Sequence, residues 1–380
     1  MSYGQRIVTT ERYISASGAK VFNTRMLPEG SIAFVCIGAT IGKMCVTDVP
    51  TLTNQQINAV VVDEAAFDRD FVFYALAGQR NDIRSIATGA ATPIINKSAF
   101  SSCTVCVPGY EAQKTIGASL RSFDDLIETN LRQIEFLEEM ARLLYREWFV
   151  HFRFPGHENV ELIDSELGPL PEGWEVKRIS EVASVNKGLS YKGAHLTDDG
   201  LPMANLKCLA PSGGFARRGT KGYDGPFKER HAILPGDIVV ANTDLTQAGN
   251  VIGSAGMVPS AGFENGGLLS HHLFRVRPDV GSFTVLRALQ SDRMRALARS
   301  VASGTTVLGM RTDDFERFAL AWPPDELLAD FESTQEPLHQ LTENLHDQNA
   351  VLREARDLLL PRLVSGELDV SELDLDGVLA

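Results

Sequence analysis

Ala87-Thr88-Gly89-Ala90-Ala91-Thr92 is matched 215 residues later by Ala302-Ser303-Gly304-Thr305-Thr306-Val307. The same spacing relates Phe100 to Phe315. A solenoid of small stacked repeats has a period of about 20–50 residues, so this spacing is far too long for one. The chain is therefore expected to contain two homologous domains, and two similar domains on one chain suit a ligand with two parts.

Two further stretches match between the copies. Leu27-Pro28-Glu29-Gly30-Ser31-Ile32 resembles Leu234-Pro235-Gly236-Asp237-Ile238, and Gln55-Gln56-Ile57-Asn58-Ala59 resembles His271-His272-Leu273-Phe274-Arg275. The copies are unequal at their starts, because about 34 residues that open the second copy, 174–207, have no counterpart in the first. We therefore expect the first domain to be incomplete at its N-terminus.

Hydrophobic periodicity predicts a mixed α/β (α+β) fold for each copy, with short strands and one or two helices. In the first copy we expect strands over residues 31–37, 57–62 and 104–107 and a helix over 69–84. In the second copy we expect strands over residues 237–241, 273–276 and 318–322 and a helix over 283–300.

Each copy is followed by a long heptad pattern. The first helix carries the row Leu120, Ile127, Ile134 and Ala141 and, three places on, the row Phe123, Asn130, Leu137 and Leu144. The C-terminal helix carries the rows Leu338, Leu345, Leu352 and Leu359, and Leu341, Gln348 and Ala355. Such rows are the a and d positions of a coiled coil, so we expect the two helices to pair. The alternative, that each helix packs only on its own domain, remains open.

Polar residues and prolines add detail to these helices. Asn130 and Gln348 interrupt the apolar rows in the way that fixes register at some cost in stability. Pro337 suits the first turn of the second seam helix, and Pro361 is expected to end it. At ~1.5 Å per residue, residues 111–147 of the first helix reach roughly 55 Å and residues 338–360 of the second roughly 35 Å.

These patterns predict an order of segments along the chain. We expect a first domain over 1–110, a central spacer helix over 111–152, a linker over 153–173, a second domain over 174–324, a C-terminal spacer helix over 325–368 and an acidic tail over 369–380.

The formal net charge of −13 at first argues against a nucleic-acid ligand. However, residues 325–380 hold 14 acidic and 3 basic residues, and residues 111–150 hold 8 acidic and 5 basic. The rest of the chain is close to neutral, and residues 174–231 carry 10 Lys and Arg against 6 Asp and Glu. Because the acidity is concentrated on the helices and the tail, the globular parts are free to present basic surfaces.

Composition limits the other classes. The 380 residues contain no apolar run of 18 and no charged-then-apolar leader, which predicts a soluble cytoplasmic protein with no membrane partner. Five cysteines, an odd number in a long chain, are expected to be reduced thiols.

Several stretches resemble the DNA-specificity subunit of Type I restriction–modification systems. Leu170-Pro171-Glu172-Gly173-Trp174-Glu175-Val176 is similar to the way that this family begins a target-recognition domain. The passage from Ile127-Glu128-Thr129-Asn130 to Trp148-Phe149 is similar to its helix-to-linker region, and 359–368 to its C-terminal ending. Gly38-Ala39-Thr40-Ile41-Gly42 and Thr53-Asn54-Gln55 resemble the body of a recognition domain. The similarity covers essentially the whole chain.

The resemblance implies that each domain reads one half of a split, asymmetric sequence in double-stranded DNA. It implies that the two helices pack antiparallel, act as a ruler between the half-sites and dock two methyltransferase subunits, with restriction subunits left open. It implies a non-catalytic subunit, with no cofactor of its own, of a Type I restriction endonuclease and site-specific DNA adenine methyltransferase complex. Successive major grooves on one face of B-DNA lie about 34 Å apart, a distance that such helices can bridge.

Candidate DNA-binding residues fall in matched positions of the two copies. The pairs Gln55-Gln56 and His271-His272 are hydrogen-bonding residues that can read base edges. If 271 and 272 lie on a strand, alternation turns one imidazole inward and the other outward. The loops 89–97 and 304–311 are rich in small and hydroxyl residues and end near a cation, and their candidate contacts are Thr92, Lys97, Thr306 and Arg311. A solvated face or a connection kept for its geometry remains the alternative.

Basic residues of the second copy form the electrostatic candidates. The main run is Lys207, Arg217, Arg218, Lys221, Lys228 and Arg230, with Tyr223 and Phe227 interleaved, and a charged loop that only aids solubility is the alternative. A smaller cluster upstream is Lys187, Tyr191 and Lys192. The arginines 287, 293, 295 and 299 on the predicted helix either face DNA or are simply exposed. The candidate partner-binding residues are those of the seam: Leu120, Ile127, Ile134, Leu137, Leu144, Leu338, Leu345, Leu352 and Leu359.

Three motifs are weak. Residues 38–44 are one residue short of phosphate-loop spacing and have Met44 in place of the Mg²⁺-binding Ser or Thr. Cys103 and Cys106 have zinc spacing but lie in a strand-like run without a second pair. Glu175 and Lys177 imitate part of a nuclease site with Asp164, which lies in a linker. No metal is predicted.

The sequence leaves rival hypotheses about function open. The chain is either a DNA reader or a structural adaptor that bridges methyltransferase and restriction subunits while its first domain recognises little DNA. Its being an enzyme in its own right is disfavoured by the absence of a methyl-donor loop and of an adenine-flipping motif. A half-subunit that pairs with another to make a complete reader is also left open.

Overall fold

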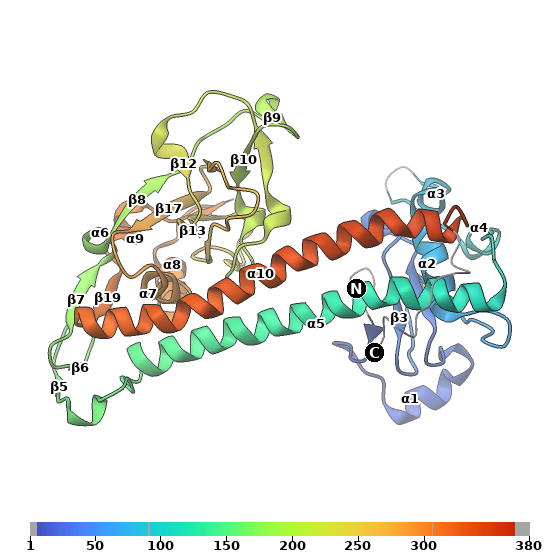
Figure 1. Cartoon of the computed structure of the whole chain (residues 1–380), viewed down its shortest axis with the longest axis horizontal. Coiled ribbons are helices and arrows are strands. Elements are labelled where there is room, and N and C mark those ends of the chain that lie inside the picture. Colours follow the sequence, from blue (N-terminus) through green and yellow to red (C-terminus); the bar gives the residue numbers. More distant parts are fainter. Residues whose placement is uncertain (1–5, 90–91, 306, 369–380) are drawn as a thin grey trace. The chain divides into compact units, whose positions relative to one another are not determined.

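The computed structural model describes residues 6–89, 92–305 and 307–368. Two compact units divide the chain: Met1–Gln133 with Leu345–Ala380 is unit 1, and Ile134–Asn344 is unit 2. Each contains one α/β lobe, which we call lobe 1 (residues 6–109) and lobe 2 (residues 174–324). There are two long helices, α5 (Tyr110–Phe149) and α10 (Asp325–Val364) (Figure 1). Each is divided between the units, with one part in unit 1 and the other in unit 2.

Lobe 1 is built on a sheet with the order β1-β3-β2-β4. Its strands are β1 (Arg6–Ile7), β2 (Ile32–Val35), β3 (Met44–Thr47) and β4 (Ile57–Val60). Its helices are α1 (Ala16–Val21), α2 (Arg69–Gly78), α3 (Arg80–Ser85) and α4 (Lys97–Ser101), with 3-10 turns at Asn23–Arg25 and Gly38–Thr40. β2 and β3 are buried along their whole length, which their continuous apolar sequences favour. Phe34, Phe71 and Tyr74 are fully buried in the core.

Lobe 2 is built on two larger sheets. The first has the order β15-β13-β17-β8, with β8 (Ala183–Lys187), β13 (Ile238–Ala241), β15 (Ala255–Met257) and β17 (Leu273–Pro278). The second has the order β12-β16-β10-β11-β9, with β9 (Leu196–Thr197), β10 (Leu201–Ala204), β11 (Lys221–Tyr223), β12 (Ala232–Ile233) and β16 (Gly267–Leu269).

Smaller elements complete unit 2. Strand pairs are β7 (Glu175–Arg178) with β19 (Ala319–Trp322), β14 (Thr243–Asp244) with β18 (Leu308–Gly309), and β5 (Leu162–Ile163) with β6 (Leu170–Pro171). The helices of lobe 2 are α6 (Ile179–Val182), α7 (Ser282–Leu289), α8 (Asp292–Val301) and α9 (Thr312–Glu316). Its 3-10 turns are Gly193–His195, Leu206–Cys208, Arg217–Gly219 and Glu229–His231, and another, His157–Asn159, precedes the lobe.

The two lobes share one topology. β2 lies between β3 and β4 and is antiparallel to both, with Ala33 opposite Cys45 and Ala59. β13 lies in the same way between β15 and β17, with Val239 opposite Gly256 and Arg275. The helices α2 and α3 correspond to α7 and α8, and α4 corresponds to α9. The predicted mixed α/β fold with two homologous domains is confirmed.

The best-matched stretch of sequence forms the same closed loop in both lobes. Thr88 and Ile94 exchange backbone hydrogen bonds of 3.0 and 2.8 Å, and Ser303 and Gly309 do so at 3.0 and 2.9 Å. Gly89 (φ 105°) and Gly304 (φ 133°) follow the first residue of each pair, in a region that favours glycine. A Cβ on Gly89 would lie 2.8 Å from the carbonyl oxygen of Thr92, and one on Gly304 would overlap that of Val307.

Three secondary-structure predictions are wrong. The helices predicted over 69–84 and 283–300 are each divided in two, near Gln79 and Ser291. In lobe 2 the Ser291 hydroxyl accepts a hydrogen bond from the Met294 N–H and starts a new helix. Residues 104–107 form no strand. Their equivalent β19 pairs with β7, which lies in the stretch 174–207 that has no counterpart in the first copy.

In unit 1, α5 and α10 pack antiparallel through a polar seam. Asn130 and Asn349 are 3% and 0% exposed, and their side-chain amides are joined by a hydrogen bond of 3.1 Å. Asp124 forms an ion pair with Arg356 and accepts a 2.6 Å hydrogen bond from the Tyr74 hydroxyl. The contact between α5, α10 and α2 is therefore a buried polar cluster rather than a purely apolar one.

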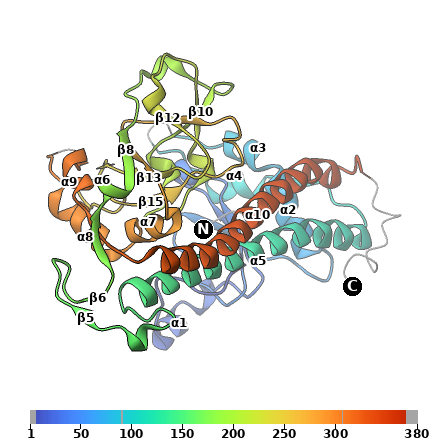
Figure 2. The same cartoon turned by 60° about the vertical axis from the view of Figure 1, so that its left-hand side comes forward.

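In unit 2 the same two helices meet again and hold lobe 2. The Gln335 amide donates to the carbonyl of Ala141 (3.4 Å) and accepts from Arg287 of α7 (3.0 Å). The Glu332 carboxylate accepts from two N–H groups at the start of α7, at 3.0 and 2.8 Å. Figures 1 and 2 both show α7 beside α10. An aromatic cluster of Trp148, Phe149, Phe154, Trp174 and Phe331 closes the end of the pair.

The seam prediction is confirmed for one row and wrong for another. Leu120, Ile127, Ile134 and Ala141 are all buried. On α10, however, Leu341 is 48% exposed, and the buried row is Thr342, Asn349 and Arg356, shifted by one residue. These polar residues are buried because their side chains have hydrogen-bond partners. Leu137, Leu144, Leu338, Leu352 and Leu359 are half-buried.

Both proline predictions are wrong. α10 begins at Asp325, so Pro337 lies inside it, and Pro361 lies within its last turn because the helix continues to Val364. A proline inside a helix costs about 3 kcal/mol. Phe331 and Leu345, on either side of Pro337, are buried, and such packing favours the helix across the proline. Within the described residues, no helix has the length and apolarity needed to cross a membrane.

We predict that the Asp124–Arg356 ion pair is a point of strong coupling. Replacing Asp124 alone by Leu leaves a buried guanidinium and should lower the stability of lobe 1 by about 3–5 kcal/mol. The double variant Asp124→Leu/Arg356→Leu should lose clearly less, because no charge stays buried. Hydrogen exchange of the β2 amides measures both. Asp357→Ala, which removes an exposed partner of Arg356, is the control and should cost under ~1 kcal/mol. Equal losses in the single and double variants would contradict the prediction.

We predict that the two loop glycines are required for stability. Gly89→Ala and Gly304→Ala should each cost at least about 1–2 kcal/mol, because a side chain at this positive φ is strained and meets the loop's own carbonyl. Gly109→Ala is the control, since a Cβ there meets nothing within 4 Å. Thermal unfolding followed by circular dichroism measures the effect. Loop variants that unfold at the wild-type temperature would count against the closed-loop argument.

Candidate nucleic-acid interface

The polar pairs of the two copies occupy the same turn. Gln55-Gln56 immediately precede β4, and His271-His272 immediately precede β17. The N–H of Cys36 donates to the carbonyl of Gln56 (2.8 Å), and the N–H of Asn242 donates to that of His272 (3.0 Å). Each turn is therefore fixed to the end of the central strand of its lobe in the same way.

The closed loops lie against the same strand ends. Ile95 N–H donates to the carbonyl of Cys36 at 2.9 Å, and Met310 N–H donates to that of Asn242 at 2.8 Å. Ile37 pairs with Ile94, as Thr243 pairs with Gly309. The structure thus brings together, in each lobe, the polar turn and the glycine loop that the sequence singled out separately.

The histidines differ from their expected arrangement. They lie in a turn rather than on a strand, so they do not point to opposite faces. Their rings lie with centroids 3.8 Å apart, and His272 Nδ1 is hydrogen-bonded to the Thr243 hydroxyl at 2.8 Å. Burial lowers the pKa of both, and the charge of Lys187 lowers them further. Neutral imidazoles offer one donor and one acceptor each, as the glutamines offer amide groups in lobe 1.

Lys187 and Tyr191 join this site. Lys187 ends β8, opposite Phe274 of β17, and is exposed. The ring of Tyr191 lies 6.3 Å from that of His271. Lys192 is exposed beside them in the chain. Lobe 2 therefore presents a cation, an aromatic ring and two imidazoles at one end of its sheet.

The loop cations are exposed at the starts of short helices. Lys97 is the first residue of α4, and Arg311 is the N-cap of α9, so they differ by one position in the repeat. The Arg311 side chain is 78% exposed, with Asp313 3.9 Å away. Thr92 is exposed as well. Thr306 lies outside the described residues.

The basic run lies mostly in the 3-10 turns next to the second sheet of lobe 2, with only Lys221 on one of its strands. Lys207, Arg218, Lys228 and Arg230 are exposed, and Lys221 on β11 is half-buried. Arg217 is different, because its guanidinium pairs with Glu343 of α10 at 2.9 Å. We therefore remove Arg217 from the DNA-binding candidates, since its side chain is already committed to the helix.

The arginines of α7 and α8 all donate hydrogen bonds within unit 2, but Arg293 and Arg299 are exposed, as one alternative predicts, whereas Arg287 is buried and Arg295 is half-buried. Arg287 is 7% exposed and donates hydrogen bonds to the side-chain oxygens of Gln335 and Gln290. Burial lowers its pKa to about 10, so it stays charged at neutral pH. Arg293 and Arg295 donate to the carbonyls of Ala319 and Pro211, and Arg299 to that of Gly249.

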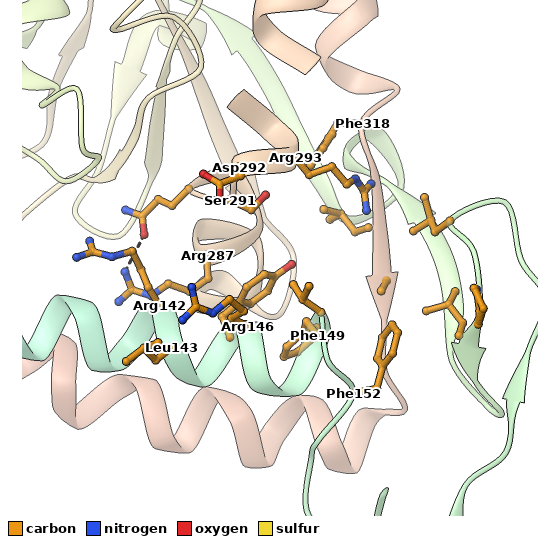
Figure 3. A pocket seen from close by; sticks show the side chains of 18 of the residues that line it. Arg142, Leu143, Arg146, Phe149, Phe152, Arg287, Ser291, Asp292, Arg293 and Phe318 are labelled. Atoms are coloured by element: carbon orange, nitrogen blue, oxygen red, sulfur yellow. Dashed lines mark hydrogen bonds between the residues drawn. The ribbon is translucent and has the colours of Figure 1, made fainter. Parts of the chain in front are cut away.

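Sequence reasoning missed a cavity of about 820 Å³ in unit 2, between the end of α5, the β5–β6 hairpin and helices α7 and α8. Figure 3 shows Arg146, Phe149, Arg287 and Arg293 around it. The Ser291 hydroxyl donates to the Ala288 carbonyl at 2.6 Å and so serves the helix cap. Among the described lining residues we find no nucleophile with an adjacent base.

The weak motifs gain no support. Residues 38–40 form a 3-10 turn and Met44 begins β3, as the strand-and-turn interpretation predicts. Cys103 is half-buried and Cys106 is exposed, and both are free thiols. In the described ranges no group of three or more Cys, His, Asp and Glu side chains is placed to hold a metal ion.

Comparisons with known proteins agree with this architecture. Residues 4–139 match the family model of the Type I restriction modification DNA specificity domain. The Type I restriction enzyme MjaIX specificity subunit of Methanocaldococcus jannaschii is 26% identical, over 96% of this chain and 83% of the relative. The HindI specificity subunit of Haemophilus influenzae is 22% identical, over 73% of this chain and 71% of the relative.

A solved structure shares the fold. The S subunit of the Type I restriction–modification system from M. genitalium superposes with a TM-score of 0.55 at 15% identity, covering 88% of this chain and 83% of that chain. The matched domain, the relatives and the fold agree: over most of its length the chain is similar to Type I restriction–modification DNA specificity subunits.

Proposed function

We propose that this chain reads a bipartite DNA sequence, with lobe 1 binding one half-site and lobe 2 the other. One observation carries the proposal. The same pairing of a polar turn with a closed glycine loop occurs at the same strand end of both lobes, with different side chains in each. A shared backbone with different hydrogen-bonding groups suits two readers of two different sequences.

In lobe 2, the turn residues His271 and His272 are proposed to contact base edges, together with Lys187 and Tyr191. Arg311, Arg218, Lys192, Lys207, Lys221, Lys228 and Arg230 are proposed to contact phosphates, which fix the position of the protein on DNA. In lobe 1 the corresponding residues are Gln55, Gln56, Thr92 and Lys97. The chain contributes recognition in this proposal, and catalysis belongs to its partner subunits.

The long helices are proposed to set the distance between half-sites and to dock two methyltransferase subunits. The seam residues hold the helices within the chain, so a partner subunit would meet other positions. Large apolar side chains exposed on α5 and α10 support such docking: Leu126, Leu131, Phe136, Leu143, Leu341, Val351 and Leu358. The 40 residues of α5 correspond to roughly 60 Å of helix.

We predict that Arg311→Ala and Arg218→Ala each weaken binding of the assembled complex to a duplex carrying the cognate sequence. Each lost phosphate contact should reduce the slope of log affinity against log salt by about 1. Gel shifts over a range of salt concentrations measure both quantities.

Arg178→Ala is the matched control for these two substitutions. Arg178 is exposed at the end of β7. The next strand, β8, runs along β17 from Ala183 to Lys187, and only Lys187 lies near the polar turn. Arg178, which precedes β8, is therefore at the opposite end of that strand. Its removal should leave affinity unchanged. If Arg311 and Arg218 can both be replaced without loss, our site assignment is wrong. If affinity for DNA is absent altogether, the chain is an adaptor between its partner subunits.

We also predict that helix length sets the half-site spacing. Inserting one heptad after Gln133 and one after Asn344 lengthens both helices by about 10 Å, which corresponds to about 3 base pairs. Selection from duplexes with randomised spacers should recover the same half-sites at the longer spacing. A heptad inserted in α5 alone is the control, because it breaks the pairing with α10. Altered half-site bases at an unchanged spacing would refute the ruler.

A further inference from the structure

One segment of lobe 2, Glu175–Lys187, covers two strand edges at once. β7 pairs with β19, and β8 pairs with β17 from Phe274 opposite Lys187 to Pro278 opposite Ala183. Between them, α6 buries Ile179 and Val182 in the core of the lobe, at 0% and 4% exposure. A short strand–turn–strand segment therefore completes this side of lobe 2.

The equivalent edges of lobe 1 are uncovered by the part of the chain that the structure describes. β4 corresponds to β17, and residues 104–107 correspond to β19. Within 6–89, 92–305 and 307–368, no strand pairs with residues 104–107 or with the edge of β4 that faces away from β2. Val107 is 40% exposed, whereas its equivalent Trp322 is 4% exposed. β4 is half-buried where residues 273–276 of β17 are buried.

The edge of β4 carries backbone groups in the right direction. Because Cys36 and Gln56 form a hydrogen-bonded pair, the alternation of an antiparallel ladder turns the C=O of Ile57 and the N–H and C=O of Ala59 away from β2, while the N–H of Ile57 donates to the carbonyl of Asn54 at 3.2 Å. In lobe 2 the equivalent of Ile57 is Leu273, and its carbonyl accepts from the Gly188 N–H at 3.2 Å. Lobe 1 therefore presents the same outward-facing row of groups to a further strand.

An apolar floor lies between the two uncovered edges. Val60, Cys103 and Val105 are partly buried and pack against the core of lobe 1. In lobe 2 the equivalents of Val60 and Val105, Val276 and Leu320, are buried in the same core cluster as Ile179 and Val182 of α6. Lobe 1 thus combines two open strand edges with a place for two apolar side chains.

We propose that lobe 1 binds a polypeptide segment with the chemistry of residues 174–187: two short strands joined by a helical turn that presents two apolar side chains three residues apart. Its second strand adds antiparallel to β4, its first strand adds to residues 104–107, and the apolar pair covers Val60 and Val105. Backbone hydrogen bonds supply affinity and the apolar floor supplies selectivity, as in other strand-addition complexes.

The occupant is distinct from residues 174–187 of the same molecule. That segment already pairs with β17 and β19 of lobe 2. Moving it to lobe 1 would leave those two strand edges of lobe 2 unpaired. This proposal concerns the surface of lobe 1 and does not rest on DNA binding.

The test uses the full chain and a labelled peptide of residues 172–188. Fluorescence anisotropy should show binding at least tenfold tighter than that of a control peptide with Ile179→Asp and Val182→Asp. Hydrogen exchange should slow over 57–60 and 104–107 and stay unchanged in β17 and β19. Equal binding of the two peptides, or protection that appears in lobe 2 instead, overturns the proposal.

Chain variants locate the contact. Val107→Asp changes an exposed side chain, and Ala59→Pro removes an outward N–H of an edge strand, where proline is tolerated. Both should weaken peptide binding at least tenfold, whereas Val8→Asp, at a residue that is 59% exposed next to β1, should not. Unchanged binding in both edge variants overturns the proposal.

Fusing the segment to the chain tests the same contact even when a free peptide binds weakly. A second copy of residues 172–188, joined ahead of Met1 through a flexible Gly/Ser linker, should protect 57–60 and 104–107 without added peptide. Absence of protection in this chain, with the fusion intact, also overturns the proposal.

Discussion

Each lobe is fixed to the long helices by a buried polar contact that reaches both of them. In unit 1 the Tyr74 hydroxyl of α2 binds Asp124 of α5, which pairs with Arg356 of α10. In unit 2 Arg287 of α7 binds Gln335 of α10, which donates to the carbonyl of Ala141 in α5. Apolar seams tolerate sliding by a turn, whereas buried polar groups are costly in any register that leaves them unpaired. The positions of the lobes on the helices, and hence of both candidate DNA sites, depend on these contacts.

The same contacts explain where the sequence misleads. Heptad counting finds the row of α5 because its members are apolar, but on α10 it selects Leu341 over Thr342. The buried positions of α10 are polar, with Asn349 and Arg356 paired across the helices, and a pattern of hydrophobic residues cannot identify them. Tertiary packing likewise carries α10 through Pro337, which propensity alone would place at a helix end.

Internal repetition identifies structurally equivalent positions of the two lobes better than residue chemistry does. Matching one copy of the sequence with the other identifies the two polar turns and the two glycine loops. In both lobes the backbones of turn and loop are joined to the same strand end by equivalent hydrogen bonds. Charge alone performed worse, because Arg217 and the arginines of α7 and α8 are committed to Glu343, Gln335 and backbone carbonyls. A cation in a sequence carries no sign of whether an acceptor lies across the fold. The strand predicted over 104–107 failed for a related reason, since a strand also needs a neighbour.

The arrangement separates geometry from specificity. Gly89 and Gly304 and the hydrogen bonds around them define the backbone, while Gln55-Gln56 and His271-His272 place different groups on the same turn. Side chains on such a turn can change without disturbing the core, because the sheet beneath is held by backbone pairing and by buried residues of β2 and β13. The long helices α5 and α10 carry more acidic than basic residues. Under the proposed function, their charge repels phosphates, so contacts to DNA phosphates fall to the basic residues of the two lobes. Affinity would then depend on both half-sites at once, because each lobe supplies only part of the binding free energy.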